Sequence, residues 1–557
     1  MNKYTIISLS VAGGVLSGLA WMDWCSGLVL LIAFAPFFLI ENHLFENRKR
    51  YSSNAFFVYL IPGFVIFSIL TLSWIRVASI LAAICVILGV SFLMAFIMWF
   101  AHIIRLKAGN IPGFIFLITF WLTFEFLCLN ITLLSPWINL GNGLSKDILF
   151  IQWYEVTGTA GGTLWILTSN LFFTIILTSL LKREIRRSFI KIVLWLILII
   201  VPSVISITRY LTIKTSEEKE SEILIIQPNI DPYREKFTIP FTKQLKQVID
   251  MANQAVTKKT DWIITPETTV DDPVNESDLS NNQYVLMIKE LATRNPGACV
   301  ITGMVSYRYN HMMNFPPANT VMETDKNGFY HDYFNSAFKI DTGKSIDIYH
   351  KSKLVPGFEM QFSNVLGRLI KKILPDLGGT SWGYGAQKER DCFEHSGIKH
   401  IIAPIICYES VFGKYVTDYV KKGAEALFII TNDGWWKNTN GYKQHLSYAS
   451  LRAIETRRSV LRAANTGISC IIDIRGKVIQ KTEWWIPETL KGNIKFENRM
   501  TPYVKYGDYL LNIACFISFI IALYVLVILP LLRKNEKKYK ECNYYRFPTS
   551  LLKKYKT

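Results

Sequence analysis

Three reactive side chains each follow a short apolar run of the kind that forms buried strands: Glu267, Lys351 and Cys407. Domains that alternate strands and helices usually place their sites just past the ends of strands. We therefore expect this carboxylate, ammonium and thiol to meet at one site. Taken singly each is weak evidence, because a free cysteine is often buried and inert, so the hypothesis depends on the ordered set.

Together the three groups could transfer an acyl chain. A thiol at its ordinary pKa is a poor nucleophile near neutral pH, so another group must take its proton. Glu267 could do so if burial raises its pKa. Lys351, with a backbone N–H near Cys407, could stabilise the oxyanion that forms when a carbonyl is attacked. The resulting thioester would then wait for a second nucleophile, which is ping-pong behaviour.

The elements that must position these groups lie in a domain that runs from about residue 220 to residue 500. Short apolar runs alternate there with helical stretches, which indicates a layered α/β domain. The runs are 223–229, 262–265, 299–302, 401–407 and 427–431, and the helical stretches include 242–255 and 282–293.

The rest of the chain is composed like a membrane protein. Half of its 557 residues are hydrophobic, and 19% are charged, against about 25% in soluble domains. A helix that crosses the hydrocarbon core needs about 20 apolar residues. Such segments are 4–21, 25–41, 55–74, 79–104, 111–132, 162–181, 190–208 and 508–532. The first has no small-residue cleavage site, and we predict an uncleaved helix rather than a signal peptide.

The basic residues indicate an orientation. They concentrate in alternate loops between the apolar segments and in the tail 533–557, which places both termini in the cytoplasm by the positive-inside rule. We therefore predict about seven helices in 1–210, a catalytic domain facing the periplasm over 220–500, a last helix over 508–532 and a basic cytoplasmic tail. The net charge of +18 then reflects topology rather than a nucleic-acid partner.

The nine cysteines show no CxxC or Cys/His spacing of the kind that binds metal. The sequence also gives no indication of a disulfide framework. We predict neither a metal nor a cofactor.

The local contexts of the three groups resemble a known superfamily. Pro266-Glu267, then Tyr349-x-Lys351 followed by Leu-Val-Pro, then Cys407-Tyr-Glu-Ser is similar to the order of motifs in the nitrilase superfamily. With apolar segments on both sides, the chain resembles bacterial apolipoprotein N-acyltransferases over nearly its whole length. Further matching motifs are Trp121 with Glu125, Pro136-Trp137 with Leu140-Gly141, the 152–161 stretch with Gln152 and Glu155, the 431–436 loop and the 462–467 strand end.

This resemblance implies a multi-helix transmembrane bundle joined to a nitrilase-like α-β-β-α sandwich in a bacterial inner membrane. It implies transfer of a fatty acyl chain from a phospholipid to the α-amino group of the diacylglyceryl-cysteine of an apolipoprotein, the last step of lipoprotein maturation. Cys407 would be the nucleophile, Glu267 the general base and Lys351 the group that stabilises the oxyanion. The residues implied to support the site are Asn335, Glu359, Tyr408, Glu409, Asn432, Trp435 and Trp436.

Three features fit a lipid substrate, each with a plainer alternative. Val365–Leu374 reads as an amphipathic helix that could lie in the membrane interface or pack on its own domain. Trp435 and Trp436 could form a mobile lid or pack beneath the site. Glu125 lies in an apolar segment, where an ionisable residue is costly, and we prefer a structural role for it.

Two other functions compete with acyl transfer to lipoproteins. A membrane-anchored amidase would use the same three groups with water as the second nucleophile, although anchoring would need only one helix. A transporter or membrane scaffold would usually carry polar groups at mid-membrane and internal repeats. The sequence has few such groups and no repeat, so we favour the enzyme.

Overall fold

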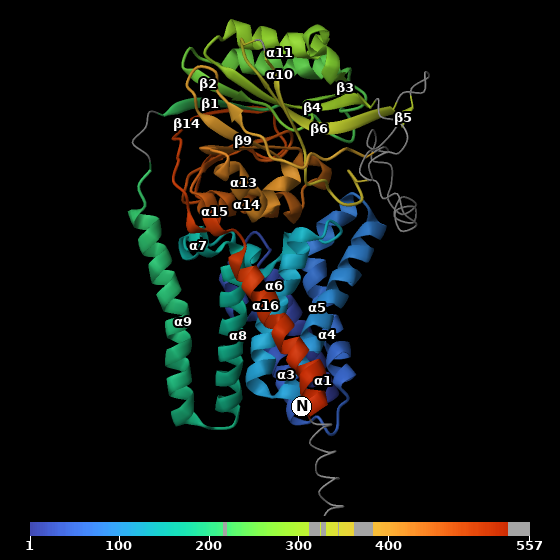
Figure 1. The fold of residues 1–557 in the computed structure, drawn as a ribbon, viewed down its shortest axis with the longest axis vertical. Coiled ribbons are helices and arrows are strands. Elements are labelled where there is room, and N and C mark those ends of the chain that lie inside the picture. Colours follow the sequence, from blue (N-terminus) through green and yellow to red (C-terminus); the bar gives the residue numbers. More distant parts are fainter. Residues whose placement is uncertain (216–219, 311–322, 325–329, 344, 361–382, 533–557) are drawn as a thin grey trace, which may run out of the picture.

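The computed structural model describes residues 1–215, 220–310, 323–324, 330–343, 345–360 and 383–532. The described chain forms a bundle of long helices with a domain of sheets and shorter helices stacked on one end (Figure 1). The predicted amphipathic segment Val365–Leu374 and the basic tail lie outside the described residues.

Each predicted apolar segment contains a helix. Within the described ranges, seven helices are long and apolar enough to cross a membrane. The remaining segment forms α1 (Lys3–Leu19), whose 17 residues span about 26 Å, slightly less than the hydrocarbon core. The seven are Gly27–Glu46, Ser53–Val77, α5 (Ile80–Ala108), α6 (Asn110–Asn130), α8 (Thr159–Leu181), Ser188–Thr212 within α9 (Ile185–Thr212), and Tyr509–Leu532, which begins with α16 (Tyr509–Leu523).

Helices α9 and α16 carry most of their apolar side chains on the outside of the bundle. In Figure 1, α9 stands beside α8 at one edge. Contiguous apolar surface of this extent is costly in water, and a helix that is apolar all round normally faces other apolar groups. Lipid chains are the surroundings that these two helices fit.

The segment between α6 and α8 folds into short turns at the end of the bundle that faces the sheets. They include η3 (Pro136–Ile138) and η4 (Leu140–Leu144). Glu125 of α6 holds this segment, because its Oε1 accepts from the Leu140 N–H at 2.7 Å and its Oε2 accepts from Thr163 Oγ1 at 2.8 Å. These contacts agree with the structural role preferred for Glu125.

The α/β domain contains two sheets in its described residues. One has eight strands in the order β14-β1-β2-β4-β6-β5, with β3 beside β4 and β7 beside β6, and the other has six in the order β13-β12-β11-β10-β9-β8. The first comprises β1 (Ser221–Gln227), β2 (Thr260–Ile264), β3 (Val270–Asn275), β4 (Cys299–Asn310), β5 (Glu323–Thr324), β6 (Tyr330–Ile340), β7 (Asp347–His350) and β14 (Glu488–Ile494). The second comprises β8 (Phe393–Glu394), β9 (Ile401–Ile406), β10 (Ala426–Thr431), β11 (Ser459–Ala464), β12 (Cys470–Ile472) and β13 (Val478–Lys481).

The strands bury both faces because side chains alternate along them. Ile223 and Ile225 of β1 belong to the core between the sheets, where Trp262 packs on Phe428 with ring centroids 5.1 Å apart. Leu224 and Ile226 of β1 point to the other face of the sheet and belong to a second core, beneath the helices that cover that face.

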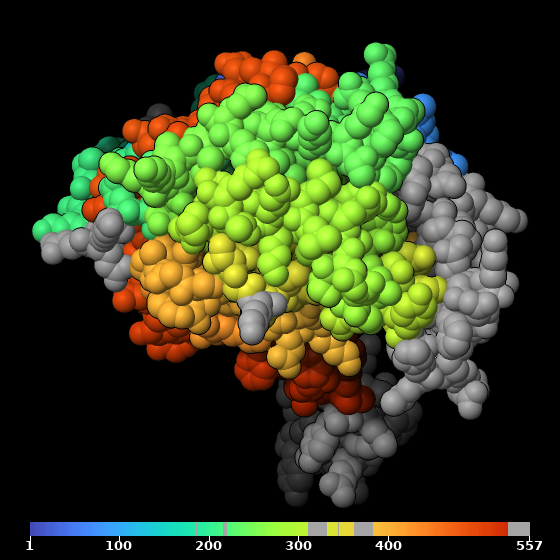
Figure 2. All heavy atoms as spheres, turned by 90° about the horizontal axis from the view of Figure 1, so that it is seen from above, coloured from blue at the N-terminus to red at the C-terminus, as the bar shows by residue number. Residues whose placement is uncertain are grey.

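These outer helices complete the layers. The first sheet is covered by α10 (Phe241–Ala255) and α11 (Gln283–Arg294), which form much of the surface seen from above in Figure 2. The second is covered by α13 (Gly413–Lys421) and α14 (Asn440–Thr456), which lie between it and the membrane helices (Figure 1). The predicted α-β-β-α sandwich on a helical bundle is confirmed.

A buried arginine ties the two halves together. Arg457 follows α14 and is completely buried. Its Nε donates to Glu155 Oε2 at 2.6 Å, and its Nη1 donates to Gln152 Oε1 at 2.7 Å. Glu155 and Gln152 belong to the membrane half, so the α/β domain is fixed on the bundle by a charged pair that is shielded from water.

We expect Arg457→Gln to destabilise this joint strongly, because breaking a buried ion pair by removing one partner costs about 3–5 kcal/mol. The measurement is the thermal unfolding midpoint in detergent. Arg209→Gln is the matched control. Arg209 also pairs with Glu155, at 2.7 Å, but 40% of its side chain is exposed, and such pairs are worth about 0–1 kcal/mol. Equal shifts in both variants would contradict the importance of the buried pair.

Candidate active site

The three predicted groups lie where three strands end. Glu267 follows β2, Lys351 follows β7 directly, and Cys407 follows β9 directly. The first two belong to one sheet and the third to the sheet that faces it. All three side chains are buried, so the site is assembled across the space between the two sheets.

Lys351 forms an ion pair with Glu267 at the centre of the site. Lys351 Nζ donates to Glu267 Oε1 at 2.9 Å and to Glu359 Oε1 at 2.8 Å. Only 1% of the lysine side chain is exposed. Glu267 Oε1 also accepts from Asn335 Nδ2 at 2.8 Å, and its Oε2 accepts from the Asn432 N–H at 3.1 Å.

A glycine allows the turn that carries Glu267. An added Cβ at Gly303 of β4 would lie 2.5 Å from the Thr268 nitrogen and 2.7 Å from the Glu267 Cα. Thr268 itself has a positive φ of 48°. Close approach of the neighbouring strand therefore requires glycine, and this requirement could not be recognised without the fold.

Cys407 sits in a sharp turn between β9 and a 3-10 helix, η7 (Cys407–Val411). Its φ is +50°, a left-handed conformation that is uncommon for a residue with a side chain. The Cys407 carbonyl accepts from Ser410 Oγ at 2.7 Å and lies 3.2 Å from His445 Nε2. Such conformations persist where the surroundings hold them, and they cluster at functional sites.

The protonation states of the three groups depend on one another. Burial raises the pKa of the Cys407 thiol and Glu267 raises it further, whereas Lys351 lowers it in part. Burial disfavours the charged form of Lys351, but Glu267 and Glu359 outweigh it, so the lysine pKa lies well above its ordinary value. The thiol thus shares the electrostatic environment of the ion pair, and near neutral pH we expect a neutral thiol beside a charged lysine.

The condition considered for Glu267 as the base, a pKa raised by burial, is not met. Burial does act in that direction, but Lys351, followed by Asn335 and Lys236, outweighs it, so the net pKa of Glu267 lies below its ordinary value. The carboxylate is therefore ionised near neutral pH and able to accept a proton without first losing one.

Asn335 and Glu359 contact the ion pair. Asn335 Nδ2 lies 2.8 Å from Glu267 Oε1 and 3.1 Å from Glu359 Oε1. Glu359 Oε2 accepts from the Val355 N–H at 2.8 Å, which ties the chain after Lys351 back onto the site. The Asn335 carbonyl accepts from the Lys351 N–H at 2.8 Å.

Glu409 joins the turn of Cys407 to the segment of Lys351. It is completely buried. Its Oε2 accepts from the Ile406 N–H at 2.9 Å, and its Oε1 accepts from the Ser352 N–H and from Tyr349 Oη, both at 2.7 Å. One carboxylate therefore fixes the thiol-bearing turn relative to the strand end that carries the ammonium.

Tyr408, Trp435 and Trp436 lie around the site in different ways. Tyr408 Oη donates to Ser135 Oγ of the membrane half at 2.9 Å. Trp436 packs between the halves, with ring centroids 5.2 Å from Trp74 and 5.7 Å from Trp137. Trp435 instead packs on the Tyr233 ring at 5.4 Å. A mobile lid formed by the two tryptophans stays a prediction.

Two residues that the sequence did not single out, Lys236 and His445, support the site. Lys236 Nζ donates to Thr268 Oγ1 at 2.6 Å and is buried beside Glu267. His445 Nδ1 lies 3.2 Å from Asp433 Oδ1, under the turn of Cys407. Burial raises the pKa of Asp433, but Arg462 and His445 lower it to about 2, so the anion is fixed there. Nothing in the sequence around His445, which lies in the middle of a helix, indicated a role at the site.

We expect the titration of Cys407 to move in opposite directions in two variants. Glu267→Gln removes a charge that disfavours the thiolate, so the pKa of Cys407 falls. Lys351→Met removes a charge that favours it, so the pKa rises. The measurement is the alkylation rate of Cys407 against pH, followed by peptide mass spectrometry.

Cys470 is the internal control for this experiment. Burial raises its pKa to about 12, and the charges that act on it come from Arg462, Asp433 and Lys481 rather than from Glu267 or Lys351. Its profile should stay unchanged. A Cys407 profile that is the same in both variants and the parent would show that the three groups do not interact.

The two halves of the chain each match a family model. Residues 13–172 match the apolipoprotein N-acyltransferase N-terminal domain, and residues 225–500 match the carbon-nitrogen hydrolase domain. Similar relatives named apolipoprotein N-acyltransferase match the chain almost end to end. That of Chlorobaculum tepidum is 25% identical over 92% of this chain and 95% of its own. That of Geobacter metallireducens is 26% identical over 90% and 91%. This chain, a bacterial membrane protein and an N-acyltransferase, therefore belongs to the apolipoprotein N-acyltransferase family.

Proposed function

We propose that this protein moves a fatty acyl chain from a membrane phospholipid, through a thioester on Cys407, to the α-amino group of a lipoprotein's diacylglyceryl-cysteine. The observation that carries the proposal is the buried Lys351–Glu267 ion pair, whose two charges both act on the Cys407 thiol. Family membership supports lipoprotein N-acylation, and the geometry supports the chemical route.

In the first half-reaction, Glu267 takes the proton of Cys407 as the sulfur attacks the ester carbonyl of the phospholipid. The negative charge that develops on the carbonyl oxygen is stabilised by the Lys351 ammonium. The intermediate collapses to a thioester, the C–O bond breaks, and the lysophospholipid leaves with the proton that Glu267 held. Glu267 is then again a carboxylate.

In the second half-reaction, the lipoprotein amine attacks the thioester carbonyl. Glu267 takes a proton from the amine, and Lys351 again stabilises the oxyanion. The C–S bond breaks, an amide forms, and the proton on Glu267 returns to sulfur. Glu267 accepts one proton and gives it up again in each half-reaction, so the same carboxylate serves both.

We further propose that the catalytic domain lies on the periplasmic side of the inner membrane, with both termini in the cytoplasm. The basic loops support this orientation. Ser277→Cys, in an exposed turn of the catalytic domain, should be labelled by a membrane-impermeant maleimide added to intact spheroplasts. Labelling only after the membrane is opened would place the domain in the cytoplasm instead.

We expect exposure to labelled phospholipid to leave an acyl group on Cys407 that hydroxylamine removes. Mass spectrometry of the Cys407 peptide measures it, and Cys407→Ala should lack it, whereas Cys392→Ala should keep it. Glu267→Gln should slow acylation by about 10²–10⁴-fold, the usual contribution of a general base. Cys392 is a half-buried cysteine of the same domain and serves as the matched control.

The second substrate separates this proposal from an amidase. A lipoprotein peptide with a free N-terminal amine should discharge the acyl label and acquire it, whereas an N-acetylated peptide should not. Release of free fatty acid at the same rate with either peptide would instead indicate hydrolysis by water. Acylation of the peptide by the Cys407→Ala variant would overturn the thioester route.

A further inference from the structure

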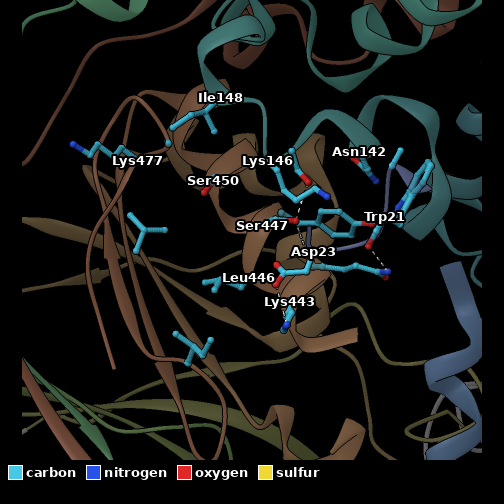
Figure 3. A pocket seen from close by; sticks show the side chains of 18 of the residues that line it. Trp21, Asp23, Asn142, Lys146, Ile148, Lys443, Leu446, Ser447, Ser450 and Lys477 are labelled. Atoms are coloured by element: carbon cyan, nitrogen blue, oxygen red, sulfur yellow. Dashed lines mark hydrogen bonds and ion pairs between the residues drawn. The ribbon is translucent and has the colours of Figure 1, made fainter. Parts of the chain in front are cut away.

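A cavity lined in part by α14 lies between the membrane bundle and the α/β domain (Figure 3). It has a volume of about 450 Å³, in the range of small-ligand sites. His445 of α14 faces Cys407, and residues two positions away on a helix point in roughly opposite directions. Lys443 and Ser447, each two positions from His445, line the cavity. The cavity is therefore separate from the proposed acyl-transfer site.

Four separate segments meet at this cavity. They are the chain just after α1, the residues around η4, the outer face of α14 and the turn between β12 and β13. Two of them belong to the membrane half and two to the catalytic domain. Ser145 and Ser447 hydrogen-bond across the joint, with their Oγ atoms 2.8 Å apart. A ligand here would contact both halves at once.

The charged lining of the cavity is strongly basic. It contains four lysines and one carboxylate, that of Asp23. Lys443 Nζ pairs with Asp23 Oδ2 at 2.9 Å. Lys146 Nζ donates to the carbonyls of Met22 and Cys25, which are neutral.

The other two lysines, Lys477 and Lys481, lie on the hairpin side, and Lys477 is seen at the rim in Figure 3. Neither takes part in an ion pair within the part of the chain that the structure describes. Even if Asp147, which lies next to Lys146 behind the lining, is included, four lysines face two carboxylates. The excess positive charge favours an anionic ligand.

The cavity also lies beside the start of the first of the seven described helices that are long and apolar enough to cross a membrane. The loop that supplies Trp21 and Asp23 joins α1 to the next membrane-spanning helix. Trp24 in this loop is 77% exposed, and Ile479, between Lys477 and Lys481, is 56% exposed. Exposed tryptophan and apolar side chains among lysines are typical of protein surfaces that lie in the headgroup region.

We propose that this cavity binds the phosphate of an anionic phospholipid, held at the joint between the membrane bundle and the catalytic domain rather than as acyl donor. The lysines supply donors and positive charge to the phosphate oxygens. Trp21, Ile148 and Val478 supply apolar walls for the glycerol and the first acyl carbons. Free phosphate shares the anion chemistry but would leave those walls uncovered, so the lipid fits the lining better.

The test is a titration of the full-length protein in detergent with phosphatidylglycerol, phosphatidylcholine or inorganic phosphate, with the thermal unfolding midpoint as readout. Phosphatidylglycerol should raise the midpoint more than phosphatidylcholine, and inorganic phosphate should raise it little. Lys477→Gln with Lys481→Gln should weaken the apparent affinity for phosphatidylglycerol by about fivefold per lysine. Neither substitution touches the candidate active site, so this result is independent of acyl transfer.

Lys258→Gln with Lys259→Gln is the matched control. These two lysines are exposed on the far side of the catalytic domain, after α10. An equal loss of affinity in this control pair would show diffuse attraction to charge and overturn the proposal. A full shift produced by inorganic phosphate alone would make the cavity a soluble-anion site. No shift with phosphatidylglycerol in the parent protein would also overturn the proposal.

Discussion

The burial of one ammonium group constrains much of the architecture. Lys351 is almost wholly removed from water, and an unpaired charge in such surroundings would be very costly. Two carboxylates must therefore reach it together, Glu267 from the turn after β2 and Glu359 from the chain after Leu354, and the Asn335 amide of β6 donates to both of them. These segments therefore have to pack against one another, and Gly303 of β4 lets the turn of Glu267 come close enough.

The facing sheet then has to bring the thiol of Cys407 to this cluster, and Glu409 fixes the position of the turn that carries the thiol. Glu409 is bound both to the strand that precedes Cys407 and to the segment that follows Lys351. The same turn contacts the membrane half through Tyr408 and Ser135. Trp137, also in the membrane half, donates to Gln444 of α14 at 2.7 Å. The reactive centre is thus held by contacts from both sheets and from the membrane-proximal turns, which suits an enzyme whose substrates arrive from the bilayer.

The parts predictable from sequence are those set by local patterns. The membrane helices were predicted from the length of the apolar segments. Glu267, Lys351 and Cys407 were predicted because each follows a short apolar run. The direction in which the pKa of Glu267 is shifted could not be predicted, because it depends on Lys351, which is 84 residues away in the sequence and is brought near only by the fold. Lys236 and His445 were missed for the same reason. Each matters only through neighbours brought near by the fold.

The electrostatics of the resting site also bear on how a thioester could survive there. Burial and Glu267 keep the thiol neutral, while Lys351 and Asn335 keep the carboxylate ionised. The proton therefore has to move as the sulfur attacks, and no free thiolate need persist in the interior. A thioester is itself uncharged, so forming it restores the charges of the resting site, one carboxylate and one ammonium. A buried site that disfavours extra charge thus favours the intermediate over a free thiolate, and it limits the access of water that would hydrolyse it. The two-step reaction that we propose, in which the thioester waits for a second lipid substrate, requires both properties.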